Sequence, residues 1–167
     1  MKPIFFFLLL LFTTNSFSQE TNNTTIETVL ERVADTLTGQ SGSWKFAIKD
    51  RLLICITDEA NNRMRIISPI TELTNLPEEE LLNALTANFH TALDVKYAIS
   101  DGALWSVYIH PLKELTESQL ESAILQVYNA AETFGTLYSS TNLSFPGRNT
   151  PPVAPEPSEK SIPLKKG

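Results

Sequence analysis

The period of the apolar residues alternates between about four and about two along this chain, and this alternation limits the possible folds more than any other feature. The first periodic segment has apolar residues at steps of three and four, which predicts an amphipathic helix. Its members are Ile26, Val29, Leu30, Val33, Ala34 and Leu37. We expect the helix to begin at Thr24, in a capping box with Glu27, and to end at Gly39.

A period of two follows the first helix and predicts strands. Residues Trp44, Phe46 and Ile48 alternate with Lys45, Ala47 and Lys49. Residues 52–57 are apolar on both faces, as in a central strand, and arginines alternate with apolar residues in 63–68. The three segments predict an antiparallel meander with a tight turn at Asp50-Arg51. We expect Pro69 to end its last strand, because proline has no amide hydrogen to donate.

A second helix is expected from Pro77, where the missing amide hydrogen has no effect. The next three residues are glutamates, which the positive end of the helix dipole favours. The residues expected to be buried along this helix are Leu81, Leu82, Leu85 and Phe89.

A hairpin and a long helix complete the pattern. Asp101-Gly102 predicts a two-residue turn between strands near 95–99 and 104–109, with Ile99 opposite Leu104. The last helix is expected to open with a capping box formed by Thr116 and Gln119. Its apolar stripe consists of Leu120, Ala123, Ile124, Val127, Tyr128, Ala131 and Phe134.

The resulting order, α-βββ-α-ββ-α, is typical of the α+β class. We expect a five-stranded antiparallel sheet with three helices packed on one face, formed by residues 24–139 as a single domain. A flexible N-terminal segment, 19–23, is expected before it. Residues 140–167 are rich in proline and poor in apolar residues, which predicts a disordered tail.

The first eighteen residues have the three parts of a secretory signal peptide. Lys2 precedes an apolar run that is too short to span a bilayer, and small residues precede Gln19. We therefore expect export to the bacterial periplasm or the extracellular space, without membrane insertion after cleavage. The formal net charge is −6, and loss of Lys2 makes the remainder more acidic. Such a surface repels nucleic acid and anionic lipid, so neither is an expected partner.

The order of elements, with a last helix that opens Leu-Thr-x-x-Gln-Leu at residues 115–120, resembles the type III secretion chaperone-like fold, which also includes the YbjN-type bacterial domains. The resemblance covers residues 24–138 and rests on topology and patterning. It implies a small, acidic, non-enzymatic protein, often dimeric, and chaperones of this group bind unfolded segments of partner proteins along apolar grooves. They act in the cytosol, whereas the leader predicts export, so only the binding role is expected to transfer.

No group of residues in the sequence predicts catalysis, a metal site or a cofactor. His90 and His110 lie in different elements, and neither has a further ligand at the spacing that a metal ion requires. Cys55 is the only cysteine, and its place in an apolar run predicts a buried, unreactive thiol. The sequence has no Gly-flanked serine turn and no glycine-rich phosphate loop. We therefore expect neither an enzyme nor a cofactor.

Five cations gather in the predicted meander of this acidic chain, and they are the candidate partner-binding residues. They are Lys45, Lys49, Arg51, Arg63 and Arg65. On one solvent-facing side of the sheet they would form a positive strip for an acidic partner. The alternative interpretation is a solvated face whose charges prevent aggregation through the sheet edges.

These observations favour an exported, non-catalytic protein-binding or assembly domain that contacts a protein partner or a second copy of itself. Two alternatives remain open. One is a small periplasmic enzyme or inhibitor whose site is assembled from scattered residues such as His110, Asp94 and Tyr108. The other is a structural component of the cell envelope that is tethered by its tail.

Overall fold

The computed structural model describes residues 20–141 of the chain. The first half contains α1 (Asn23–Val33), β1 (Thr36–Gln40), β2 (Ser43–Ile48), β3 (Arg51–Asp58) and β4 (Arg63–Glu72). The second half contains the short 3-10 helix η2 (Leu73–Asn75), α2 (Glu78–His90), β5 (Lys96–Ser100), β6 (Ala103–His110) and α3 (Glu117–Glu132).

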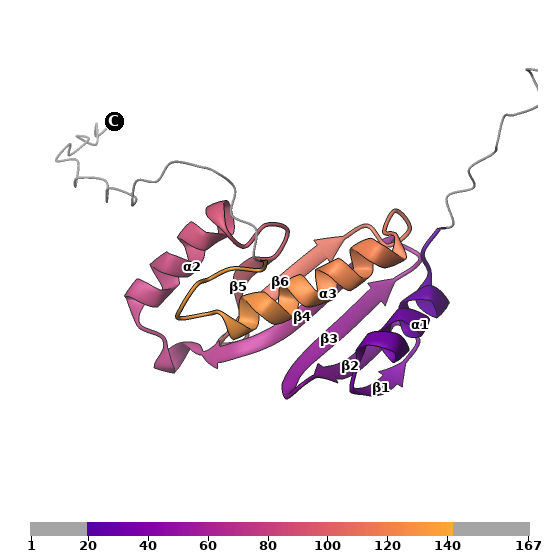
Figure 1. The fold of residues 1–167 in the computed structure, drawn as a ribbon, viewed down its shortest axis with the longest axis horizontal. Helices are drawn as coiled ribbons and strands as arrows, with labels where there is room; N and C mark the ends of the chain where they lie inside the picture. Colours follow the sequence, from indigo (N-terminus) through magenta and orange to yellow (C-terminus); the bar gives the residue numbers. More distant parts are fainter. Residues whose placement is uncertain (1–19, 142–167) are drawn as a thin grey trace, which may run out of the picture.

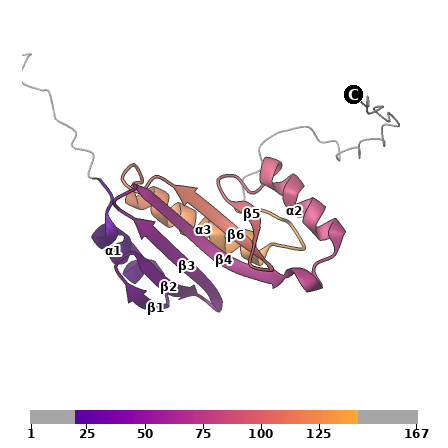
Figure 2. The ribbon, with the colours of Figure 1, turned by 180° about the vertical axis from the view of Figure 1, so that it is seen from behind.

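All six strands form one antiparallel sheet in the order β1-β2-β3-β4-β6-β5. Helix α3 lies along β4 and β6, and α1 lies next to α3 on the same side of the sheet (Figure 1). Seen from behind, the sheet lies in front of α3, and no helix of the described residues covers it there (Figure 2). We call this uncovered side the open face. The structure therefore has the α+β architecture that the sequence predicts.

The sixth strand, β1, corrects the expected number of five. The sequence predicts helix as far as Leu37, but α1 ends at Val33 and Thr36–Gln40 pairs with β2. Asp35 explains the break, because its carboxylate accepts a hydrogen bond of 2.5 Å from the backbone of Lys49 and so holds the chain beside the β2–β3 turn.

The start of α1 also differs from the prediction. The N-cap is Asn22, whose side chain accepts a hydrogen bond of 3.0 Å from the backbone of Thr25. The predicted capping box of Thr24 and Glu27 is therefore wrong. An asparagine cap satisfies the free amide hydrogens of the first turn as well as a threonine cap does.

The core lies between the sheet and the helices α1 and α3. Its strand residues alternate with residues of the open face, as the period of two predicts, and include Trp44, Phe46, Leu53, Cys55, Met64 and Ile66. Helix α3 contributes Leu120, Ala123, Ile124 and Val127. Burial raises the pKa of the Cys55 thiol to about 12, so this side chain stays protonated and serves as an apolar core residue.

Two predicted local features of the second half are confirmed. The hairpin turn has positive φ angles at Asp101 and Gly102 and sets Ile99 opposite Leu104. At the start of α3, Thr116 and Gln119 form both hydrogen bonds of a capping box.

Strand β4 does not end at Pro69, which corrects a further expectation. Pro69 pairs with Trp105 of β6, and β4 continues through a bulge to Glu72. The β3–β4 pairing ends at Ile54 and Ile67, so beyond that point only the pairing with β6 continues. The missing amide hydrogen is tolerated because Pro69 lies beyond the end of the β3–β4 pairing and has no partner strand on that side among the described residues.

Helix α2 begins after Pro77 as predicted, but the face that it buries is not the predicted one. Leu82, Leu85 and Phe89 are 58%, 56% and 87% exposed, while Ala84 and Ala87 are buried. The small alanines allow the helix to lie close to β5 at the edge of the sheet.

Both ends of the described chain are packed against the domain. Thr21, in the segment that the sequence predicts to be flexible, is buried and its hydroxyl donates a hydrogen bond to the carbonyl of Leu115. Ser140, in the predicted tail, is buried, and its backbone donates a hydrogen bond of 3.3 Å to the carbonyl of Thr91. The predicted signal peptide, 1–18, and residues 142–167 of the predicted tail lie outside the described residues.

We predict that Gly39→Ala destabilises the protein much more than Gly102→Ala. Gly39 has a φ of 121°, and an added Cβ would lie 2.3 Å from the carbonyl oxygen of Ser43, whereas Gly102 has open space around it. Urea unfolding should show a loss of about 1 kcal/mol for Gly102→Ala, from the left-handed backbone alone. For Gly39→Ala the loss should exceed ~2 kcal/mol, because a backbone clash is added. Equal losses would contradict the β1–β2 pairing.

Candidate functional site

The open face carries apolar side chains where a solvent-facing sheet usually carries polar ones. The register places Ile54 of β3, Ile67 of β4 and Val107 of β6 side by side across three strands. The adjacent rows add Leu52 (43% exposed), Ile56 (40%), Pro69, Trp105 and Ile109 (61%). A continuous exposed apolar patch of this kind is typical of a contact surface.

Three of the five candidate cations lie on the open face. Lys45, Arg63 and Arg65 are exposed and alternate with the buried residues of β2 and β4. None of them forms an ion pair with another residue between 20 and 141. On β5, Lys96 lies opposite Val107, at the end of the row that Ile54, Ile67 and Val107 form. Cations therefore border the apolar patch, and Asp58, opposite Arg63, is an acid on this face.

The other two candidate cations lie on the helix side and do not join the strip. A nitrogen of the Arg51 guanidinium lies 2.6 Å from a carboxylate oxygen of Glu132 in α3. The ammonium of Lys49 lies 5.6 Å from the centre of the Tyr128 ring. Both contacts fasten the β2–β3 turn to α3, so the structure gives these two residues a structural role. The predicted turn at Asp50-Arg51 is wrong by one residue, because Ile48 pairs with Arg51 and the turn is Lys49-Asp50. Arg51 is therefore the first residue of β3 and lies on the same face as the buried Leu53, whereas the sequence predicted it in the turn.

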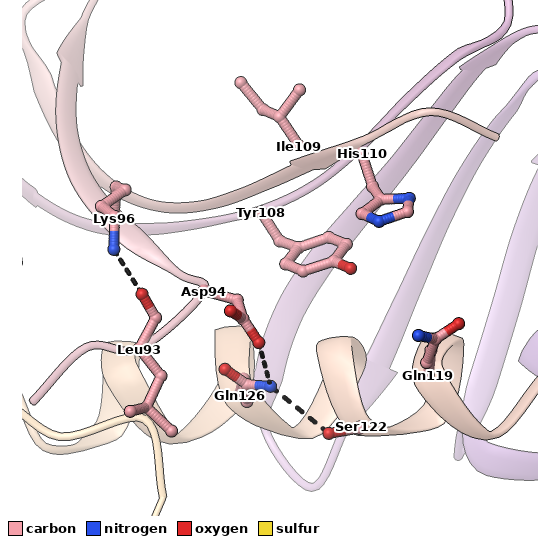
Figure 3. Close-up of a pocket in the computed structure, with 9 residues that line it drawn as sticks. All are labelled: Leu93, Asp94, Lys96, Tyr108, Ile109, His110, Gln119, Ser122 and Gln126. Carbon is pink, nitrogen blue, oxygen red and sulfur yellow. Dashed lines mark hydrogen bonds between the residues drawn. The ribbon is translucent and has the colours of Figure 1, made fainter. Parts of the chain in front are cut away.

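A polar cleft of about 460 Å³ opens on the other side of β6, between the start of β5 and α3. Asp94, Tyr108 and His110, which the sequence offers as scattered residues, lie together in its wall (Figure 3). Helix α3 supplies the opposite wall with Gln119, Ser122 and Gln126. The sequence contained a signal for these three, since they follow one another at steps of three and four beside the apolar stripe of α3.

Hydrogen bonds hold several of the polar side chains that line the cleft. The amide nitrogen of Gln126 donates to the carboxylate of Asp94 and to the hydroxyl of Ser122, both at 3.3 Å. Nδ1 of His110 lies 2.7 Å from the carbonyl oxygen of Pro111. Because a carbonyl oxygen only accepts, we assign the ring hydrogen to Nδ1, which leaves Nε2 of the neutral ring as an acceptor.

Tyr108 is the most buried aromatic side chain of the cleft, at 6% exposed. Its ring stacks parallel to that of His110, with 5.9 Å between the centres. Burial, and next the charge of Asp94, raise the pKa of Tyr108, so its hydroxyl remains a hydrogen-bond donor. Residues 20–141 offer this hydroxyl no hydrogen-bond partner, and Figure 3 shows it projecting into the cleft above α3.

The described residues contain few other side chains that could bind a ligand or take part in catalysis. Between residues 20 and 141 no three histidine, cysteine, aspartate or glutamate side chains lie close enough together to hold a metal ion. His90 ends α2 and contacts Phe89 edge-on. None of the described helices has the length and apolar character needed to cross a bilayer.

Comparison with known proteins gives a result for the fold. No family model matches the chain, and no curated protein is significantly similar to it in sequence. Among solved structures it matches a chain of the HopA1-SchA chaperone-effector complex, with a TM-score of 0.51 and 16% identity over 67% of this chain and 94% of that one. The chain has the fold of type III secretion chaperones. The resemblance predicted from the order of elements is thereby confirmed at the level of topology.

Two further structures with the chaperone fold agree. A chain of the ExsC-ExsE complex matches with a TM-score of 0.55 and 13% identity over 70% of this chain and 92% of that one. The third match is to the structure of the Yersinia pestis type III secretion chaperone SycH in complex with a stable fragment of YscM2. It has a TM-score of 0.53 and 12% identity over 68% of this chain and 98% of that one.

Proposed function

We propose that this protein is a non-catalytic binding domain that holds a segment of a partner protein on its open face. The observation that carries the proposal is the row of Ile54, Ile67 and Val107 on a side of the sheet that no described helix covers. Removing apolar surface from water contributes about 25 cal/mol per Å² of favourable free energy, so a partner that covers this row would form a more stable complex. The chaperone fold supports the proposal, because all three solved structures are complexes with another protein.

The cations at the border of the patch indicate the charge of this partner. Lys45 and Arg65 lack an acidic partner among residues 20–141. A segment with apolar residues in its centre and carboxylates at its flanks would satisfy both parts of the surface. Such complementarity accelerates encounter and selects against basic segments. We therefore infer an acidic, apolar segment as the partner of the open face.

Labelled peptides with an apolar centre test this function. A peptide with glutamates at its flanks should bind the full-length protein roughly tenfold tighter than the same peptide with lysines, because the bordering cations attract only the former. The double variant Leu52→Ser, Ile56→Ser should lose binding of both peptides, because it removes apolar contact area. Fluorescence anisotropy measures the affinities.

A matched control separates binding from folding in this experiment. Leu125 is 54% exposed on α3, away from the open face, so Leu125→Ser should leave binding unchanged. Circular dichroism should show the same thermal midpoint for all variants within a few degrees, because the altered side chains are already exposed. Unchanged binding by the double variant would refute the role of the open face.

We also propose self-association through α2. Leu82, Leu85 and Phe89 follow one another at steps of three and four and form an exposed apolar stripe on this helix. Two copies of the stripe would shield each other across a two-fold axis without covering the open face.

Light scattering coupled to size-exclusion chromatography tests the self-association. The wild-type protein should elute as a dimer at tens of micromolar, and the double variant Leu85→Ser, Phe89→Ser should elute as a monomer, because the contact loses most of its apolar area. The corresponding change on another exposed surface, Leu137→Ser, should not alter the mass, although Leu137 is 73% exposed. A monomeric wild-type protein would refute this proposal.

Export remains part of the proposed function, and it rests on the composition of residues 1–18. The expected first residue of the protein recovered from the cell envelope or the medium is Gln19, which N-terminal sequencing determines. Recovery of the uncleaved chain from the cytoplasm would contradict export.

A further inference from the structure

Strand β6 extends beyond the strand that pairs with it, and this extension borders the polar cleft. β5 begins at Lys96, opposite Val107, so residues 108–110 have no partner strand on that side among the described residues. The chain before β5 turns away at Leu93, which has a φ of 49°. The result is a short free edge of β6 beside the polar cleft.

The backbone of Ile109 points into the gap. The side chain of Asn88 bonds both backbone groups of Tyr97, at 3.1 and 2.7 Å, so these groups face away from β6. In an antiparallel strand the N–H and C=O groups of successive residues point to opposite sides. The backbone groups of Lys96 therefore face β6 and bond those of its partner Val107. Ile109 lies two residues beyond Val107 and has the same orientation. Its N–H and C=O are therefore available to a further strand.

The side chains around this free edge are rich in hydrogen-bond acceptors. Among residues 20–141, the carboxylate of Asp94 accepts one side-chain hydrogen bond, from Gln126 at 3.3 Å. Nε2 of His110 is a second acceptor. The cation at the rim, Lys96, is occupied, because its ammonium donates to the carbonyl oxygen of Leu93 and is directed away from the centre of the cleft (Figure 3). A cation supplied from outside would complement Asp94.

The hollow continues past Asp94 toward α2. A second hollow of about 320 Å³ shares Leu93, Asp94 and Lys96 with the cleft and reaches Asn88 and Phe89 at the end of α2. An elongated ligand fits two adjoining hollows better than a compact one does.

We propose that this cleft binds an extended segment of a partner protein, which pairs with the backbone of Ile109 and places a lysine or arginine side chain against Asp94. The added strand gains main-chain hydrogen bonds from the free edge, and the ion pair with Asp94 selects the basic side chain. The hydroxyl of Tyr108, which projects into the cleft, gains an acceptor from the bound segment. This site lies on the side of β6 that faces α3 and prefers the opposite charge to the open face, so it does not depend on the function proposed above.

Short labelled peptides of alternating threonine and valine test the proposal on the full-length protein. The peptide with one central lysine should bind at least tenfold tighter than the peptide with a central glutamate. Asp94 is exposed, so Asp94→Asn should weaken the lysine peptide only about fivefold, the upper range for loss of a single exposed ion pair. Asp101→Asn, which alters an exposed carboxylate at the other end of the same hairpin, should leave binding unchanged.

Nuclear magnetic resonance provides a readout that mere attraction of charges does not change. On binding of the lysine peptide, the amide hydrogen of Ile109 should become protected from exchange, and the ring-carbon signal of Tyr108 next to its hydroxyl should shift. The double variant Leu52→Ser, Ile56→Ser should retain both effects, because it alters the open face alone. Failure of the open face and failure of the cleft are therefore distinguishable.

Three results would overturn the proposal. The first is equal affinity for the lysine and glutamate peptides, and the second is an Ile109 amide that remains unprotected at saturation. The third concerns residues 142–167, which contain Arg148, Lys160, Lys165 and Lys166 and follow directly on Thr141. If the lysine peptide binds only after these residues are removed, the occupant of the cleft is the chain's own C-terminal segment and not a partner.

Discussion

The contact of α3 with β4 and β6 determines the arrangement of everything else in this protein. Both apolar packing and hydrogen bonds fix the position of α3. The hydroxyl of Ser106 donates to the carbonyl of Val127, and the hydroxyl of Tyr97 donates to the carbonyl of Ala130, both at 2.9 Å. Because the helices are placed on this side, the alternate residues of every strand are left on the open face. The polar flank of α3 at the same time becomes one wall of the cleft.

The two candidate surfaces follow from this one-sided arrangement and differ in character. The open face is broad and apolar with cations at its border, and it suits a segment that shields Ile54, Ile67 and Val107. The cleft is narrow and polar, and it combines a free strand edge with Asp94. A partner with an acidic part and a basic part in extended conformation would match both surfaces across β6, since Ile109 has its side chain on one and its backbone on the other.

The period of the apolar residues predicted those elements in which the local sequence alone determines which residues are buried. The hairpin at Asp101-Gly102 and the cap at Thr116 are local devices, so the sequence predicted them in detail. β1 was missed because its strand is largely exposed and has no alternation. In α2 the large apolar side chains predicted the buried face, yet the close approach to β5 required Ala84 and Ala87. The meeting of Asp94, Tyr108 and His110 depends on how α3 lies across β6, which no local pattern encodes.

The anchoring of Thr21 and of Ser140 has a mechanical consequence. Thr21 is fastened beside Leu115, just before α3, whereas the carbonyl of Ser140 accepts a hydrogen bond from Asn129 near the far end of that helix. The two anchor points are thus about 20 Å apart along the helix axis. Tension applied through both ends would therefore act first on these two anchors and along the axis of α3.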